Sequence, residues 1–279
     1  MIKRIGWLNR RIADDYLAEH EMMLGPLYGN LEAHGWMYQG GALRSGKVLG
    51  LLDENKKLKG LLARFNDGNC MIHAAHEKDV LEFVPELLDM RFHTLWMLGC
   101  GKDTARHMNE QLDLGARIIE QYMMLQPELV EGDVGHLEIQ DISTDPYDQE
   151  YIEAACKLLE ACFHYKPARH VFAQRMAERM PEEIYLLAGT QGRWVGQAHI
   201  QAWTPEYGHI GGVATLPQFG GRGIARALTG RLCRYIHEED RLPTLTVRKD
   251  NIPALKVYQR LGFEPVGEVT VLDTFPAES

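Results

Sequence analysis

Hydrophobic and polar residues alternate most regularly in the C-terminal half of the chain. The alternation over 136–142 is typical of a half-buried strand. Apolar residues at helical spacing predict helices over about 148–162 and 168–179. The later elements predicted for this half are strands at 184–188, 194–203 and 209–215, a helix from Ile224 to Ile236, a strand at 245–247, a helix from Asn251 to Leu261 and a closing strand at 263–272. This order predicts an α/β fold of the mixed α+β kind, with a mostly antiparallel sheet flanked by helices.

The N-terminal half repeats the second part of that order. Its predicted elements are strands at 47–52, 58–65 and 70–74, a helix at 80–90, a strand at 94–98, a helix at 104–112 and a strand at 116–124. We therefore predict a tandem duplication with domains at 1–132 and 133–279, and Gly132-Asp133 is the candidate boundary. The alternative is a single large sheet with an unrelated N-terminal half.

Composition and charge narrow the possible partners. The 279 residues are 45% hydrophobic and 25% charged, as in a soluble globular protein, and 30 basic against 39 acidic residues give a net charge of −9. Phosphate backbones and anionic lipids are repelled by such a protein on average. We expect neither nucleic acid nor a membrane as the partner.

Cysteine usage and the first residues bear on the compartment. The five cysteines are scattered and form no C-x-x-C pair, which favours reduced thiols over a disulfide framework or a zinc site. Charges interrupt the apolar residues of the first turns, so we expect no signal peptide, and no apolar run is long enough for a membrane helix. We expect a cytoplasmic protein without a metal centre.

The segment 212–228 places a glycine-rich turn between a predicted strand and a predicted helix. Glycines let the backbone approach a ligand closely, and N–H groups at a helix N-terminus bind anions such as pyrophosphate. The segment matches neither a Walker loop, because no Lys-Ser/Thr follows the last glycine, nor G-x-G-x-x-G. The structural alternative is a tight turn that holds no ligand.

This segment and a second motif resemble the GCN5-related N-acetyltransferases (GNATs). The family's acetyl-CoA loop follows V-A-T-x-P and reads Gln/Arg-x-x-Gly-x-Gly/Ala, which matches here from Val213 onward. The second motif, Asn-x-x-Ala-x-x-x-Tyr followed by Gly-Phe, is complete from Asn251 to Phe263. The resemblance covers about 137–275 well, and the N-terminal half only through its order of elements. It implies two tandem GNAT-like domains, the first a degenerate copy without a phosphate loop.

The resemblance implies which residues bind acetyl-CoA. The backbone of the fourth strand would pair with the pantetheine arm in a splay between the fourth and fifth strands, while the loop would hold the pyrophosphate. One position departs from the family pattern, since Gly220 stands where the family has Gln or Arg, and Arg222 and Arg226 can supply the missing charge. The expected binding residues are Val213, Ala214, Thr215, Gly220, Gly221, Arg222, Gly223, Ile224, Ala225, Arg226 and Asn251.

The resemblance also implies an acid and a base. The amine must be neutral to attack the thioester, so a base must remove its proton. Many members of the family carry a Glu at the position of His209, and a histidine is a competent base near neutral pH. Glu206 is the second candidate, and Tyr258 occupies the family's acid position. The alternatives to these catalytic roles are that His209 is a buried histidine of the strand, Glu206 a solvated carboxylate in the turn and Tyr258 a tyrosine of the core.

These expectations together predict an enzyme that moves an acetyl group from acetyl-CoA to a primary amine of a small molecule or peptide. The N-terminal copy has Ala74-Ala75-His76-Glu77-Lys78-Asp79 in place of the loop, so we expect it to shape the acceptor site rather than bind CoA. The alternatives are a non-catalytic CoA-binding sensor or scaffold, and transfer of a longer acyl group or transfer to a hydroxyl. A monomer is preferred to a dimer.

Overall fold

The computed structural model describes residues 1–34, 46–130, 137–145, 147–163, 170, 172, 184–190 and 192–274. The chain divides into two compact units, which are not consecutive in sequence. Unit 1 comprises 1–123, 246–251 and 265–279, and unit 2 comprises 124–245 and 252–264. The predicted boundary at Gly132-Asp133 lies outside the described residues, as does most of the predicted helix at 168–179.

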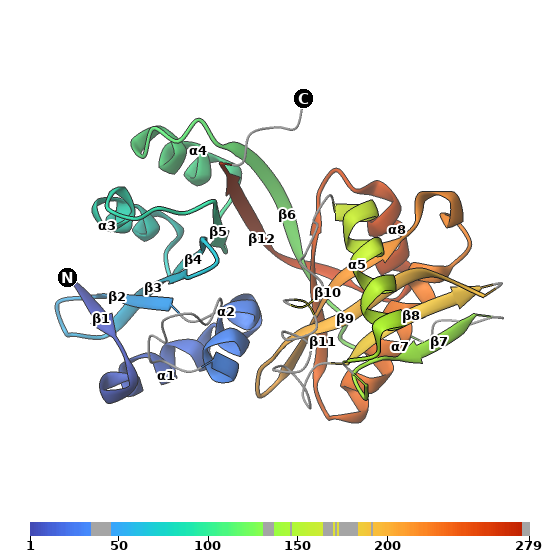
Figure 1. Ribbon diagram of the computed structural model, residues 1–279. Coiled ribbons are helices and arrows are strands. Elements are labelled where there is room, and N and C mark those ends of the chain that lie inside the picture. The colour runs from blue at the N-terminus through green and yellow to red at the C-terminus, as the bar shows by residue number, and fades with distance from the viewer. Residues whose placement is uncertain are drawn as a thin grey trace. The chain divides into compact units, whose positions relative to one another are not determined.

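Unit 1 contains a mixed sheet whose last strand comes from the C-terminal end of the chain. Neighbouring strands pair in the order β1-β2-β3-β4-β5-β12, and only the β4–β5 pair is parallel. Figure 1 shows β12 running beside β5. The elements are β1 (Ile2–Ile5), η1 (Trp7–Asn9), α1 (Arg11–Glu19), α2 (Glu21–His34), β2 (Gly46–Leu52), β3 (Leu58–Phe65), β4 (Asn69–Ala74), η2 (Glu77–Phe83), α3 (Val84–Leu88), β5 (Thr94–Leu98), α4 (Lys102–Gln111), β6 (Arg117–Leu125) and β12 (Glu264–Asp273).

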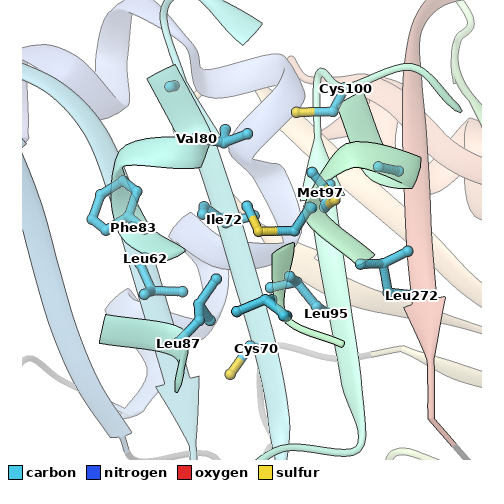
Figure 2. Packing of buried hydrophobic residues seen from close by; sticks show 14 of the residues in the cluster. Leu62, Cys70, Ile72, Val80, Phe83, Leu87, Leu95, Met97, Cys100 and Leu272 are labelled. Atoms are coloured by element: carbon cyan, nitrogen blue, oxygen red, sulfur yellow. The ribbon is translucent and has the colours of Figure 1, made fainter. Parts of the chain in front are cut away.

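Two apolar clusters form the core of unit 1. One joins α1 and α2 to residues such as Leu61 and Val269 of the sheet, and the other joins η2, α3 and α4 to residues such as Ile72 and Leu95. Figure 2 shows Val80, Phe83 and Leu87 packed against the strands in the second cluster. Since strand side chains alternate between the two faces, the sheet buries apolar residues on both sides.

The first thirty residues hold elements that the sequence pattern did not predict. Strand β1 and helices α1 and α2 precede the first predicted strand. Helix α2 has Pro26 in its interior, and both glycine and proline are poor helix formers. Its buried residues Leu24, Leu27 and Leu31 show that tertiary packing outweighs these propensities. The helix predicted over 80–90 is instead the 3-10 helix η2 followed by the short helix α3.

The strands of unit 2 have the same pairing pattern. They pair in the order β7-β8-β9-β10-β11, and only β10–β11 is parallel. Helix α5 contacts β9 and β10, and the cluster that it forms includes Tyr185 and Leu187 of β8. The elements are β7 (Glu138–Asp141), α5 (Gln149–Phe163), β8 (Tyr185–Thr190), β9 (Arg193–Trp203), β10 (Tyr207–Thr215), η3 (Pro217–Phe219), α7 (Ile224–Glu238), β11 (Leu242–Arg248) and α8 (Ile252–Arg260).

The two units share more than their order of elements. In each, the parallel pair stops before its strands end, at Ile72–Met97 in unit 1 and at Ile210–Leu245 in unit 2. A helix follows the second strand of each parallel pair, α4 in unit 1 and α8 in unit 2. The predicted fold class, a mixed sheet flanked by helices, is confirmed.

Candidate active site

The parallel pair of unit 2 separates part-way along β10. Residues 207–210 of β10 pair with residues 242–245 of β11, and no pairing is recorded between the two strands beyond Ile210. Strand β10 itself continues to Thr215. The backbone of β10 after Ile210 therefore offers an edge along which an extended ligand can form hydrogen bonds of the sheet type.

A bulge lies in the separated part of β10. On the β9 side, Gly211 pairs with His199 and Ala214 pairs with Gln197, so Gly212 and Val213 together face one residue of β9. Gly212 has a φ of +60°, a conformation that favours glycine. A bulge bends the strand and turns individual N–H groups out of the ladder. The predicted binding residues Val213, Ala214 and Thr215 thus lie in or directly after a bulge.

The glycine loop follows β10 at once and ends at the first turn of α7. Gly221 and Gly223 have φ values of +74° and +79°, and Gly223 is the N-cap of α7. A Cβ at either glycine would meet no described atom within 4 Å, so the chain is open around them. The first turn of α7, all of it described, contains no acidic residue. Its N–H groups and the helix dipole make this end of α7 an anion site.

Basic side chains flank the loop, as expected. The guanidinium of Arg222 lies 5.1 Å from the centre of the Phe219 ring. Arg226, in the first turn of α7, has its Nε buried without a hydrogen-bond partner among the described residues. A buried guanidinium nitrogen costs free energy unless it is paired. A pyrophosphate bound at Gly221–Gly223 would provide that partner, so the loop residues fit the acetyl-CoA that the resemblance implies.

Asn251 and Tyr258 lie on either side of the start of α8. Asn251 directly precedes the helix and belongs to unit 1, where its N–H donates to the carbonyl of Arg248. Tyr258 belongs to unit 2 and is buried against Phe263, with ring centres 5.9 Å apart. Burial, and to a smaller extent the nearby Cys233, raise the pKa of Tyr258. The phenol is therefore protonated at neutral pH.

The two predicted bases differ in their surroundings. His209 is 2% exposed, and its Nδ1 lies 3.1 Å from Oγ1 of Thr244 on β11. Burial lowers the pKa of His209 to about 4, so the imidazole is neutral at pH 7 but binds a proton weakly. Glu206 is exposed in the turn before β10. The role of either residue as the base remains a prediction.

Among the described residues, no three His, Cys, Asp or Glu side chains lie close enough together to hold a metal ion. Within the same described ranges, no helix is both long and apolar enough to span a bilayer. The residues between the helices predicted over 148–162 and 168–179 lie mainly outside the described ones.

Comparisons with known proteins match the site to a family. The model of the acetyltransferase (GNAT) family matches residues 150–263, which include β10, the loop, α7 and α8. An L-amino acid N-acetyltransferase, AaaT of Escherichia coli, is 31% identical over 140 residues, which are 48% of this chain and 83% of that enzyme. The chain belongs to the GNAT family. It is an acetyltransferase.

Solved structures extend the likeness in fold to the whole chain. A tandem GNAT protein from the clavulanic acid pathway matches 100% of this chain and 99% of its own, with a TM-score of 0.56 and 14% identity. A Drosophila protein matches 98% of both chains with a TM-score of 0.71 and 11% identity. A GNAT-family acetyltransferase of Colwellia psychrerythraea matches 98% of this chain with a TM-score of 0.55 and 14% identity. The tandem GNAT arrangement that the sequence predicted is confirmed.

The N-terminal unit carries a different structure where a GNAT loop would lie. After β4 the chain enters η2, whose first turn contains Glu77 and Asp79. The carboxylate of Glu77 accepts a hydrogen bond of 2.8 Å from the N–H of Gly101, the N-cap of α4. The first turn of η2 in unit 1 thus carries carboxylates, whereas the first turn of α7 in unit 2 carries none.

The resemblance to GNATs did not identify the bulge or the side chains beside it. Gly211 and Gly212 lie against Gln201 and His199 of β9, respectively. The only sequence signal was the regular spacing of Gln197, His199 and Gln201 along a predicted strand. Polar residues at alternate positions are ordinary in a strand with one solvated face, so the spacing alone predicted nothing about catalysis.

Proposed function

We propose that this GNAT transfers an acetyl group from acetyl-CoA to a primary amine. The observation that carries the proposal is the early end of the β10–β11 pairing at Ile210–Leu245, followed directly by a glycine loop at the N-terminus of α7. An open strand edge suits the amide-bearing pantetheine arm, and the end of a helix suits pyrophosphate. The open strand edge and the glycine loop follow one another in the chain, as the pantetheine arm and the pyrophosphate follow one another in CoA.

The binding roles follow from these positions. Val213, Ala214 and Thr215 provide strand backbone for the arm. The loop and first turn from Gly220 to Ala225 provide N–H groups for the pyrophosphate, and Arg222 and Arg226 provide positive charge. Acetyl-CoA supplies an activated thioester, so the protein needs to orient the amine, remove its proton and let the thiol leave. Tyr258 is the proposed proton donor to the leaving sulfur.

The relatives suggest where to search for the acceptor. The Escherichia coli relative is named an L-amino acid N-acetyltransferase, which makes free L-amino acids the first class to test. Polyamines, aminoglycosides and peptide amines complete the panel, since a net charge of −9 favours cationic acceptors on average. The acceptor is a small molecule or a peptide. We propose that the protein acts as a monomer in the cytoplasm, and light scattering tests the oligomeric state.

Thiol release tests the proposal. Purified protein is incubated with acetyl-CoA and each amine, the free CoA thiol is measured with a chromogenic reagent, and the product is identified by mass spectrometry. Acceptor-dependent thiol release together with an acetylated amine would support the proposal. Tyr258→Phe is expected to lower kcat about tenfold, because a thiolate leaves without protonation but leaves faster with an acid nearby.

A non-catalytic CoA sensor is the second candidate. Two departures from the family pattern favour it, namely Gly220 at the Gln/Arg position and the buried His209 at the position of the base. Calorimetry distinguishes the two functions. Tight CoA binding without turnover on the whole panel would favour the sensor, and it would contradict the acetyltransferase proposal.

The N-terminal unit is proposed to be a degenerate copy that does not bind CoA. Glu77 and Asp79 near the start of its helical segment would repel a phosphate, and Glu77 already occupies the N–H of Gly101. A CoA stoichiometry of one per chain would agree with this proposal.

A further inference from the structure

A row of polar side chains runs along one face of β9. Gln197, His199 and Gln201 stand at alternate positions, so they share that face. The register with β8 identifies it, because Leu187 pairs with Gln197 and Tyr185 pairs with His199. Both partners on β8 belong to the apolar cluster beneath α5. The polar row therefore interrupts an apolar face of the sheet.

Burial makes this row costly to keep. Gln197 is fully buried, and its Nε2 donates to the carbonyl of Gly212 over 3.4 Å. Its Oε1 has no hydrogen-bond partner among the described residues. Burying an amide group without full compensation costs free energy, so a polar row here points to a polar ligand.

The two glycines of the β10 bulge make room for this row. A Cβ on Gly212 would meet Cε1 of His199 and lie 2.5 Å from its Nδ1, and a Cβ on Gly211 would meet Oε1 of Gln201. Neighbouring strands lie about 4.8 Å apart. The imidazole of His199 therefore extends from β9 across β10, with its Cε1–Nδ1 edge over Gly212.

The orientation of His199 is held from the other side. The Tyr185 ring stacks on the imidazole, with centres 5.0 Å apart and an angle of 2° between the planes. Such stacking restricts the ring to one plane. His199 thus reaches the separated part of β10, at the bulge next to the strand residues that the proposed function assigns to the pantetheine arm. Unlike His209, which is 2% exposed, His199 is half-buried.

We propose that His199 is a catalytic base of this enzyme and takes the proton from the acceptor amine above Gly212. The proposal rests on the proposed function. The acceptor nitrogen forms the C–N bond to the thioester carbonyl carbon while the C–S bond breaks. His199 accepts the N–H proton, Tyr258 gives its proton to the departing sulfur, and the imidazolium proton returns to the tyrosinate through water. Atoms and charges balance, with an acetylated amine and a free thiol as products.

Four variants test this role in the full-length enzyme. His199→Gln and His199→Ala remove the base, His209→Gln removes the competing candidate, and His107→Gln is the control because His107 is exposed on α4 of unit 1. A positioned base contributes about 10²- to 10⁴-fold, so we expect kcat to fall at least 100-fold in both His199 variants. His107→Gln should retain wild-type kcat. Calorimetry with CoA should give a Kd within threefold of wild type for His199→Gln, and thermal unfolding should show that the variant is folded.

Two readouts separate a base from a structural residue. Added imidazole should restore part of the activity of His199→Ala, because the half-buried site can admit it, and should have no effect on the wild type. The acidic limb of the kcat/KM pH profile should disappear in His199→Gln. In NMR spectra of the wild type, the imidazole Cε1–H signal assigned by its loss in His199→Gln should shift when CoA is added.

The outcomes distinguish this inference from the proposed function. If the wild type acetylates an amine and His199→Gln keeps more than a third of kcat with an unchanged pH profile, the role of His199 is wrong and the proposed function stands. If His209→Gln loses both its activity and the acidic limb of the kcat/KM pH profile, while His199→Gln is active, the base is His209. If the wild type releases no thiol with any amine, the proposed function fails and the role of His199 fails with it.

Discussion

Gly223→Ala tests whether the loop binds CoA through its backbone. Gly223 caps α7 with a φ of +79°, and a Cβ there would meet no described atom within 4 Å. The substitution therefore adds conformational strain without a clash, and the left-handed region costs a non-glycine residue about 1–2 kcal/mol. Relaxing that strain means rotating the backbone at the start of α7. The N–H groups proposed to hold the pyrophosphate would then point elsewhere.

The expected effect on CoA binding follows from the hydrogen bonds lost. A hydrogen bond to a charged group contributes about 1.5–3 kcal/mol, so losing one should raise the Kd for CoA about 10- to 100-fold. Calorimetry measures that Kd. The free energy of unfolding in urea should fall by about 1–2 kcal/mol in the same variant.

Gly192→Ala is the matched control. Gly192 lies in the turn between β8 and β9 with a φ of +70°, and a Cβ there would also meet no described atom within 4 Å. The same loss of stability is expected, with CoA binding unchanged. The reasoning would be refuted if Gly223→Ala bound CoA as tightly as the wild type while losing stability, or if both variants lost affinity equally.

Three further predictions concern single side chains. Arg226→Leu should raise the Kd for CoA about tenfold and leave the Kd for pantetheine unchanged, because pantetheine lacks the pyrophosphate. Calorimetry measures both Kd values, and an equal loss of affinity for the two ligands would contradict the prediction. The pKa of His209 is about 4 in the folded protein, against about 6.5 in the unfolded chain. As the pH falls below about 6.5, the unfolded chain therefore binds a proton before the folded protein does. This group should remove about 3 kcal/mol from the free energy of unfolding between pH 7 and pH 4. In urea unfolding, the free energy of unfolding should depend less steeply on pH in His209→Asn than in the wild type. Equal pH dependence in the two proteins would show that the pKa of His209 is not lowered by folding. Calorimetry should give one CoA per chain both in the wild type and in Glu77→Gln. The variant should lose less than about 1 kcal/mol of stability. A second CoA site in either protein would contradict the proposal that unit 1 does not bind CoA.

Much of the fold was predictable because its signals are local. Alternation over β8, β9 and β10 and helical spacing in α7 and α8 depend on which face of each element is buried. The loop was predictable for a similar reason, since Gly221 and Gly223 occupy positive-φ positions that disfavour other residues. Helix α2 was missed because its glycines and Pro26 oppose helix formation locally, while its buried leucines stabilise it only through packing.

The pairing partner of the last strand depends on the tertiary structure. The sequence showed that 263–272 is a strand, and β12 extends over Glu264–Asp273. It did not show the partner, which is β5 of unit 1, with Val269 opposite Leu98. An alternating pattern specifies which face is apolar but carries no information on which strand lies alongside.

The sequence by itself determined the family and the tandem order of elements, because motifs of glycine and asparagine record local backbone requirements. Only the tertiary structure decided what surrounds each candidate base. His209 matches the family position but is buried against Thr244, whereas His199 matches no motif and reaches the bulge through the space left by Gly212. Burial and contact between strands depend on residues far apart in sequence, so no local pattern could distinguish the two histidines.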